Sequence, residues 1–98
     1  MATYAVLFNW TDQGIKNYRE SPSRVEAFSE QIGPQTGVTI KDLYWTVGPY
    51  DIIALFDAPD DESLSAALLA LGAAGNVRST SLRAFGRDEF PRILERAQ

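Results

Sequence analysis

The chain has 98 residues, a length that supports one hydrophobic core and therefore one domain over 1–98. It contains no His and no Cys, which excludes an imidazole base, a thiol nucleophile, a disulfide and the usual ligands of zinc, haem and iron–sulfur clusters. We therefore expect no cofactor and no metal. The sequence lacks a long apolar run and a basic leader with an apolar core, so we expect a cytoplasmic protein without a membrane partner.

The net charge of −4 has the wrong sign for a protein that holds phosphate backbones, and we expect no nucleic-acid partner. The charge is unevenly distributed, with −6 over 1–77 and +2 over 78–98. Five arginines cause the difference: Arg78, Arg83, Arg87, Arg92 and Arg96. Acidic residues lie among them, so this segment is either a mixed solvated face or a surface for an acidic neighbour.

A strand and a divided helical region are predicted for the first part of the chain. Residues 3–10 are rich in β-branched and aromatic residues, which favours a strand. Thr11 is a candidate N-cap for a first helical piece, and Ser21 before Pro22 is a candidate cap for a second one. The residues that we expect to close the region are Gly33, Pro34 and Gly37.

A hairpin is predicted next, with strands at 38–47 and 50–58 that are joined at Gly48 and Pro49. Each flanking segment is rich in residues that favour strands, and the Gly-Pro pair is typical of a turn.

The last part of the chain contains a helix, a strand and a second, shorter helix. Pro59 and three acidic residues open a helix whose apolar face consists of Leu64, Ala67, Leu68 and Leu71. A strand follows at 76–86, and Asp88 is the candidate cap of a short amphipathic tail.

This order predicts an α+β, ferredoxin-like βαββαβ fold with a four-stranded antiparallel sheet and a C-terminal helix. Both faces of the first predicted strand are apolar, with Tyr4, Val6, Phe8 and Trp10 alternating with Ala5 and Leu7. Helices can cover only one face, and a monomer rarely leaves so large an apolar patch exposed. We therefore expect a homodimer or larger homo-oligomer that pairs through the second face. The alternative is that the C-terminal helix folds over that face.

The chain resembles the GYD domain family, which is named for a Gly, Tyr and Asp motif seen here in GPYD at 48–51. Similar segments cover nearly the whole chain: TDQGI at 11–15, SPSR at 21–24, DAPDDE at 57–62 and GNVRSTSLRAF at 75–85. The resemblance implies a ferredoxin-like chain of the dimeric α+β barrel superfamily and brings no reaction with it. That superfamily includes cofactor-independent monooxygenases, isomerases and haem enzymes, and the haem branch fits poorly to a chain without His.

Two interpretations are open for Tyr50 and Asp51. In the first, Asp51 bonds to nearby backbone amides as part of the turn. In the second, Asp51 is a catalytic base or ligand anchor beside the Tyr50 hydroxyl, which requires burial that raises its pKa.

Aromatic residues on the predicted strands are numerous enough to line an apolar pocket. The candidate ligand-binding residues are Trp10, Tyr44, Tyr50, Asp51 and Arg83, with Asn9 and Thr11 as further polar groups at the mouth.

The acidic cluster formed by Asp57, Asp60, Asp61 and Glu62 is explained by helix capping and the helix dipole, and we assign it no metal. Two functions are consistent with these features. The first is binding of a small aromatic or lipophilic metabolite in a homo-oligomer, as a carrier, a sensor or a cofactor-free enzyme. The second is a non-catalytic module for oligomerisation or protein interaction.

Overall fold

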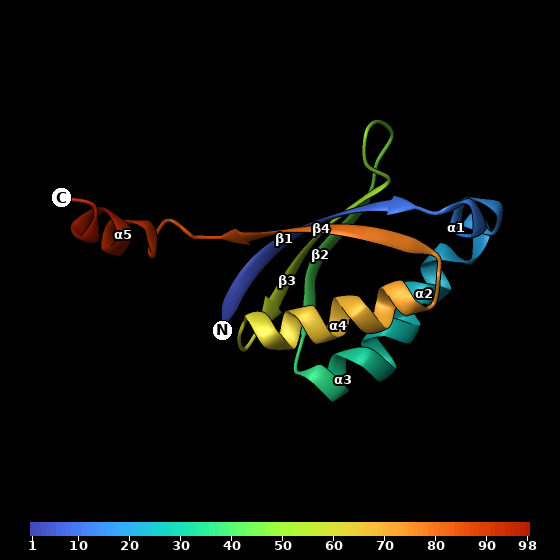
Figure 1. The fold of residues 1–98 in the computed structure, drawn as a ribbon, viewed down its shortest axis with the longest axis horizontal. Coiled ribbons are helices and arrows are strands. Elements are labelled where there is room, and N and C mark those ends of the chain that lie inside the picture. The colour runs from blue at the N-terminus through green and yellow to red at the C-terminus, as the bar shows by residue number, and fades with distance from the viewer.

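The computed structural model describes all 98 residues, Met1–Gln98. Figure 1 shows the order of the elements along the chain. The strands are β1 (Ala2–Trp10), β2 (Thr39–Trp45), β3 (Ile52–Ala58) and β4 (Val77–Ala84). The helices are α1 (Asp12–Lys16), the 3₁₀ turn η1 (Tyr18–Glu20), α2 (Ser21–Ala27), the π-helix η2 (Phe28–Ile32), α3 (Gly33–Thr36), α4 (Asp61–Ala73) and α5 (Phe90–Arg96).

The four strands form one antiparallel sheet in the order β2-β3-β1-β4. The central strand β1 pairs on one side with β3, where Phe8 lies opposite Ile52, and on the other with β4, where Tyr4 lies opposite Arg83. This topology confirms the predicted ferredoxin-like fold. The hairpin differs in detail, because β2 ends at Trp45 and β3 begins at Ile52, which leaves a longer loop than a tight Gly-Pro turn.

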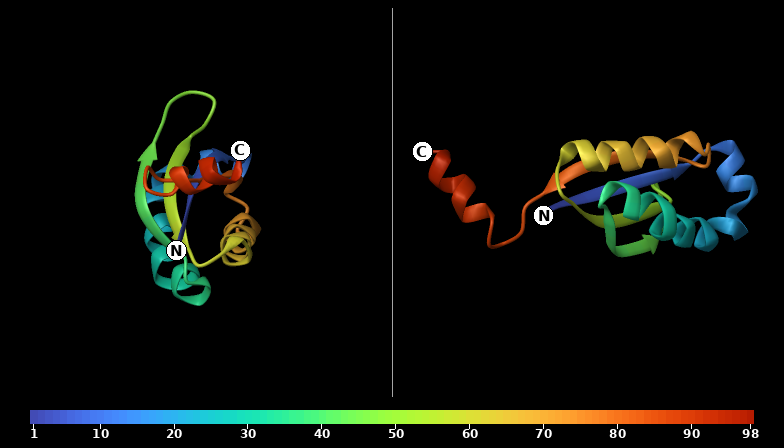
Figure 2. Two further views of the ribbon diagram at one scale, coloured as in Figure 1. Left: turned by 90° about the vertical axis from the view of Figure 1, so that its left-hand side faces the viewer. Right: turned by 90° about the horizontal axis from the view of Figure 1, so that it is seen from below.

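All the helices that pack on the sheet lie on one of its faces (Figure 1, Figure 2). Helix α4 and the α2–α3 segment run side by side across that face. Tyr4, Val6 and Phe8 point from β1 into this layer and are buried, as are Leu64 and Ala67 of α4. The structure thus decides which of two apolar sheet faces meets the helices.

The first helical region begins as predicted and continues further than predicted. The Thr11 hydroxyl caps α1 by accepting a hydrogen bond from the Gly14 amide at 3.1 Å. Ser21 is not a cap, because α2 starts at Ser21 itself and its hydroxyl accepts from the Trp45 indole at 2.9 Å. Gly33 and Pro34 do not end the region either, since α3 includes both and ends at Gly37 with a left-handed φ of 77°.

The β1–α1 turn packs against the turn between α4 and β4. The Thr11 amide donates to the Asn76 carbonyl at 3.1 Å, and the Gln13 side chain donates to the Ala74 carbonyl at 3.0 Å. A Cβ atom on Gly14 would lie 1.9 Å from the Asn76 carbonyl oxygen. Only glycine permits this close approach, so Gly14 of the TDQGI segment can pack directly against Asn76 of the GNVRSTSLRAF segment.

The C-terminal helix differs most from the prediction. Helix α5 begins at Phe90, and Asp88 does not cap it. No side chain caps this helix, and Glu89 accepts from the Gly86 amide at 3.1 Å in the turn before it. The ribbon carries α5 past the end of the sheet rather than over it, so the alternative in which this helix covers the second face is wrong (Figure 1). None of the helices combines the length and the apolar character that a membrane span requires.

Candidate functional site

A cavity of about 230 Å³ lies between the sheet and the helices. Its walls are mainly aromatic and aliphatic side chains: Phe8, Phe28, Ile32, Ile40, Leu43, Ile52, Phe56 and Leu71. Three of the rings pack edge to face, with the Phe56 centre 6.2 Å from that of Phe8 and 5.5 Å from that of Phe28. An apolar cavity of about 150 Å³ accommodates benzene, so this space is large enough for one ring and a short substituent.

Four polar residues complete the cavity wall: Ser21, Arg24, Gln31 and Asn76. The Arg24 Nη2 atom donates to the Asn17 carbonyl at 2.6 Å, and it lies 3.9 Å from a Glu20 carboxylate oxygen. The Arg24 Nη1 atom is buried and has no hydrogen-bond partner. A buried donor without an acceptor lowers the stability of the folded protein, and this donor belongs to a residue that lines the cavity.

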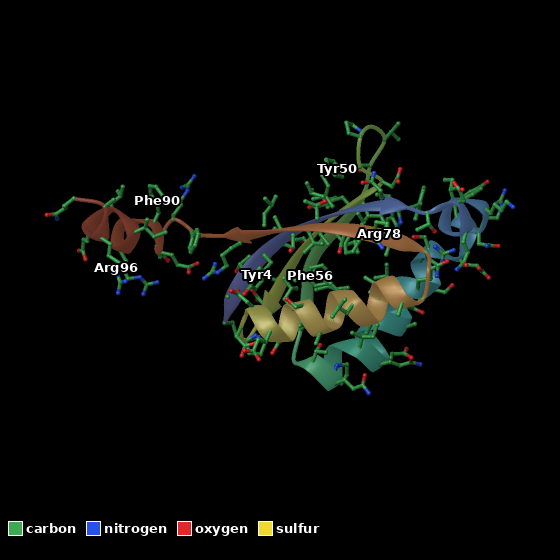
Figure 3. The ribbon with its side chains drawn as sticks, viewed as in Figure 1. Tyr4, Tyr50, Phe56, Arg78, Phe90 and Arg96 are labelled. Atoms are coloured by element: carbon green, nitrogen blue, oxygen red, sulfur yellow. The ribbon has the colours of Figure 1, made fainter.

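The GPYD segment lies in the loop between β2 and β3. Asp51 Oδ2 accepts from the Trp10 amide at 2.8 Å, and the Asp51 amide donates to the Phe8 carbonyl at 2.8 Å. The Asn9 side chain holds the loop by donating to the Pro49 carbonyl at 2.7 Å. These bonds correspond to the first interpretation of Asp51, in which its carboxylate bonds to backbone amides as part of the turn. Figure 3 shows Tyr50 at this protruding hairpin, away from the rings between sheet and helices.

Trp10 and Tyr44 lie on opposite faces of the sheet. Trp10 packs against the core on the helix-facing side, and its indole Nε1 is buried without a partner. Tyr44 lies opposite Ile53 on the other face and is 63% exposed. Neither side chain contributes to the cavity wall.

Arg83 lies far along the sheet from Trp10, opposite Tyr4 at the start of β1. Its guanidinium carbon lies 4.4 Å from the centre of the Phe85 ring and 5.6 Å from that of Tyr4, and it pairs with Glu89 at 3.3 Å. The Tyr4 hydroxyl donates to Asp61, and this hydrogen bond, together with burial, raises the pKa of Tyr4.

The five candidate ligand-binding residues are therefore not gathered around one cavity. Trp10 and Asp51 are joined, Tyr50 is next to Asp51, and Tyr44 and Arg83 are elsewhere. Sequence reasoning missed Arg24. One sequence feature indicates it, because Arg24 precedes Phe28 by four residues and thus shares a helix face with the apolar stripe.

The acidic cluster is used in local structure. Asp60 caps α4 by accepting from the Ser63 amide at 2.8 Å, and this bond lowers the pKa of Asp60. Asp57 accepts from the Thr3 hydroxyl at 3.1 Å. Nowhere does the structure bring three acidic side chains into an arrangement that could hold a metal ion.

The second sheet face has no helix over it (Figure 2). Six apolar side chains lie on this face and alternate with the core residues along each strand: Ala5 and Leu7 of β1, Ile53 and Leu55 of β3, Tyr44 of β2 and Leu82 of β4. Polar side chains flank them, with Asp42 opposite Leu55 and Thr80 opposite Leu7. The first four apolar side chains are partly buried by their neighbours, and Leu82 is 50% exposed. We call these six apolar residues the open face, and it is a continuous apolar surface.

Helix α5 forms an arm that extends from the end of β4. Phe90 and Leu94 on this helix are 51% and 56% exposed. Figure 3 shows Phe90 and Arg96 on this helix, remote from the rest of the molecule. The arm thus presents apolar side chains and arginines that the chain itself does not cover.

The amino-acid sequence of the chain matches one known protein family. The GYD domain profile matches residues 4–94. The chain belongs to the GYD domain family. This GYD domain is also similar to a protein of Thermus thermophilus named glutamine synthetase and cystathionine beta-lyase binding protein. The two are 30% identical over 84 residues, which cover 86% of this chain and 88% of the relative.

Solved structures show the same fold. TTHA0845 from Thermus thermophilus has a TM-score of 0.55 and 27% identity, with 88% of the GYD domain and 95% of that chain covered. The leucine response regulatory protein LrpA of Mycobacterium tuberculosis has a TM-score of 0.65 at 18% identity. The match covers 87% of the GYD domain but only 51% of LrpA, so the likeness concerns the fold of one part of that regulator.

Proposed function

We propose that this protein is a homo-oligomeric interaction module that pairs through its open face and binds a partner protein. The observation that carries the proposal is the continuous apolar surface on the sheet side opposite the helices. Two such faces that pack on each other remove the leucine and isoleucine side chains from water, at the usual spacing of about 10 Å between sheets.

The arm is the surface that we assign to the partner protein. Its arginines belong to the segment 78–98, which has a charge of +2 on an otherwise acidic chain. Exposed Phe90 and Leu94 add apolar contact area beside these charges, a combination that suits an acidic protein surface. The relative from Thermus thermophilus is named for binding two enzymes, and this name supports a protein as the partner. We propose that the protein binds this partner in the cytoplasm.

Sedimentation velocity tests the pairing with a matched pair of leucine variants. Leu55→Lys introduces a charge into the open face, whereas Leu69→Lys introduces the same charge on α4, where Leu69 is 75% exposed. We expect the wild-type protein and Leu69→Lys to sediment as the same homo-oligomer and Leu55→Lys to sediment as a monomer. A monomeric wild type, or an unchanged Leu55→Lys, would contradict the pairing.

Biolayer interferometry tests the partner. The probes are purified glutamine synthetase and cystathionine beta-lyase from the organism that produces this GYD domain. We expect at least one of them to bind, and we expect the double variant Arg92→Glu/Arg96→Glu to bind about tenfold or more weakly. Salt should weaken binding as well, because exposed charges are screened. Absence of binding to both enzymes would count against a shared partner with the relative.

A second candidate function is the binding of a small apolar molecule in the cavity, either for transport, for sensing or for cofactor-free chemistry. The observation that favours it is the cavity of about 230 Å³ that is lined mainly by apolar side chains. The predicted ligand residues Trp10, Tyr44, Tyr50, Asp51 and Arg83 do not line this cavity. We propose Tyr50 and Asp51 as anchors only for a ligand bound at the hairpin. Native mass spectrometry of freshly purified protein tests for retained ligand, and unchanged retention in Asp51→Asn and Tyr50→Phe would remove the anchor role from these two residues.

A further inference from the structure

We propose that the cavity binds a small organic carboxylate with an apolar body, and that Arg24 and Ser21 hold its charged end. The proposal rests on the second candidate function, binding of a small molecule in the cavity, and adds the chemical class of the ligand. It assigns a ligand-binding role to two residues of the SPSR segment whose hydrogen bonds within the fold leave donor groups unused.

Arg24 supplies the charge. Its Nη2 atom already donates to the Asn17 carbonyl at 2.6 Å and lies 3.5 Å from the Gly14 carbonyl. Its Nη1 atom is buried and donates to nothing. Glu20, which is paired with Nη2 at 3.9 Å, is an exposed side chain and does not satisfy Nη1. A guanidinium stays protonated at all relevant pH values, so the unsatisfied group is a cationic donor.

Ser21 supplies a second donor on the same helix face, because it precedes Arg24 by three residues. Its side chain is 4% exposed and lines the cavity. The hydroxyl oxygen accepts from the Trp45 indole at 2.9 Å, which leaves the hydroxyl hydrogen available to donate. Two donors on one helix face, one of them cationic, match the two oxygens of a carboxylate.

The rest of the wall determines the body of the ligand. No Asp or Glu lines the cavity, and the remaining polar residues are Gln31 and Asn76. Phe8, Phe28 and Phe56 all line the space, and the Phe56 ring packs edge to face with the other two. A volume of about 230 Å³ is smaller than the sites of drug-sized ligands, which begin at about 300 Å³. A single ring or a short branched chain therefore fits, whereas a nucleotide does not.

Isothermal titration calorimetry with three probes of nearly equal shape tests the ligand class. The probes are phenylacetate, its neutral amide phenylacetamide and the cation phenylethylammonium. We expect phenylacetate to bind at least tenfold more tightly than phenylacetamide, and phenylethylammonium to bind least. This comparison uses only the wild-type protein, so it does not depend on the folding of a variant.

Variants then locate the interaction. Arg24→Gln should remove the preference for phenylacetate, whereas Arg19→Gln should retain it, because Arg19 stacks on Tyr18 outside the cavity. Ala27→Leu should weaken binding of all three probes, because a larger side chain at this exposed lining position obstructs the cavity. Ala66→Leu is its control, since both alanines are exposed helix residues and only Ala27 lines the cavity.

The two levels of the proposal fail differently. Equal binding of acid and amide, with loss of both in Ala27→Leu, would keep the cavity as a binding site and overturn the carboxylate. A preference for phenylacetate that survives in Arg24→Gln would overturn the role of Arg24. Failure of all three probes to bind the wild type would overturn both the carboxylate proposal and the cavity as a site for ligands of this size.

Discussion

Replacement of Gly14 by alanine tests whether the β1–α1 turn and the α4–β4 turn hold the fold together. The added Cβ atom would lie 1.9 Å from the Asn76 carbonyl oxygen and 2.9 Å from its carbonyl carbon, whereas ordinary contacts begin at 3.4 Å. Relief of the clash thus requires the two backbone segments to separate by about 1.5 Å. The obstacle is backbone on both sides, so no side-chain rotation can provide that space.

The cost follows from the bonds that join these segments. The bond from the Thr11 amide to the Asn76 carbonyl is 3.1 Å long and that from Gln13 to the Ala74 carbonyl is 3.0 Å, and the Thr11 hydroxyl also donates to the Gly75 carbonyl. Each is worth about 0.5–1.5 kcal/mol net. Loss of the three costs about 3 kcal/mol, and the better helix propensity of alanine offsets about 1 kcal/mol. We expect a net loss of about 2 kcal/mol, which lowers Tm by roughly 8–16 °C in a domain of this size.

Urea unfolding followed by tryptophan fluorescence measures the change, and Gly72→Ala is the matched control. Gly72 lies in α4, and a Cβ atom there meets nothing within 4 Å. That variant should therefore gain about 0.5–1 kcal/mol from helix propensity alone. If Gly14→Ala unfolds within about 0.5 kcal/mol of wild type, the close approach to Asn76 does not constrain the fold and the reasoning is refuted.

Three further substitutions test individual bonds. Because its bond to Asp61 and burial raise the pKa of Tyr4, the stability from this group is present below the ordinary tyrosine pKa of 10.0 and is lost as pH rises above it; Tyr4→Phe should reduce the alkaline decline seen in urea unfolding curves. Asp60 has a lowered pKa, so Asp60→Ala should destabilise the protein at pH 7, and its difference from wild type should vanish as pH falls below the ordinary value of 3.8. Asp51→Ala should lower the free energy of unfolding by about 1–2 kcal/mol, because it leaves the Trp10 amide without its acceptor; an unchanged midpoint would show that water replaces the carboxylate.

Local sequence patterns were sufficient for the order of elements and for most of their ends. The alternation in β1 and the β-branched run in β3 predicted strands within two residues of their observed bounds. The sequence predicts Thr11 as a helix cap and residues 59–62 as a helix start, and the capping bonds of Thr11 and Asp60 each span only three residues. Such interactions are encoded by neighbours along the chain, so composition and spacing reveal them.

Interactions between distant segments were not accessible in this way. Ser21 has the sequence context of a cap, but the Trp45 indole occupies its hydroxyl from 24 positions along the chain. Arg24 lies on α2, and it lines the cavity together with strand residues such as Ile40 and Phe56, which are distant in the sequence. The candidate ligand set was drawn from strand residues alone and omitted this cation on a neighbouring helix.

The sequence by itself determined a ferredoxin-like sheet with two apolar faces and a basic C-terminal segment. It left open which face the helices cover, because the side chains of β1 alternate between two sets that are equally apolar. Tertiary structure decided this by placing Tyr4 and Phe8 against α4 and the α2–α3 layer, which left Leu7 on the open face. The tertiary structure also decided the position of α5. After β4 the chain continues past the end of the sheet, so this amphipathic helix lies away from the open face that it could have covered.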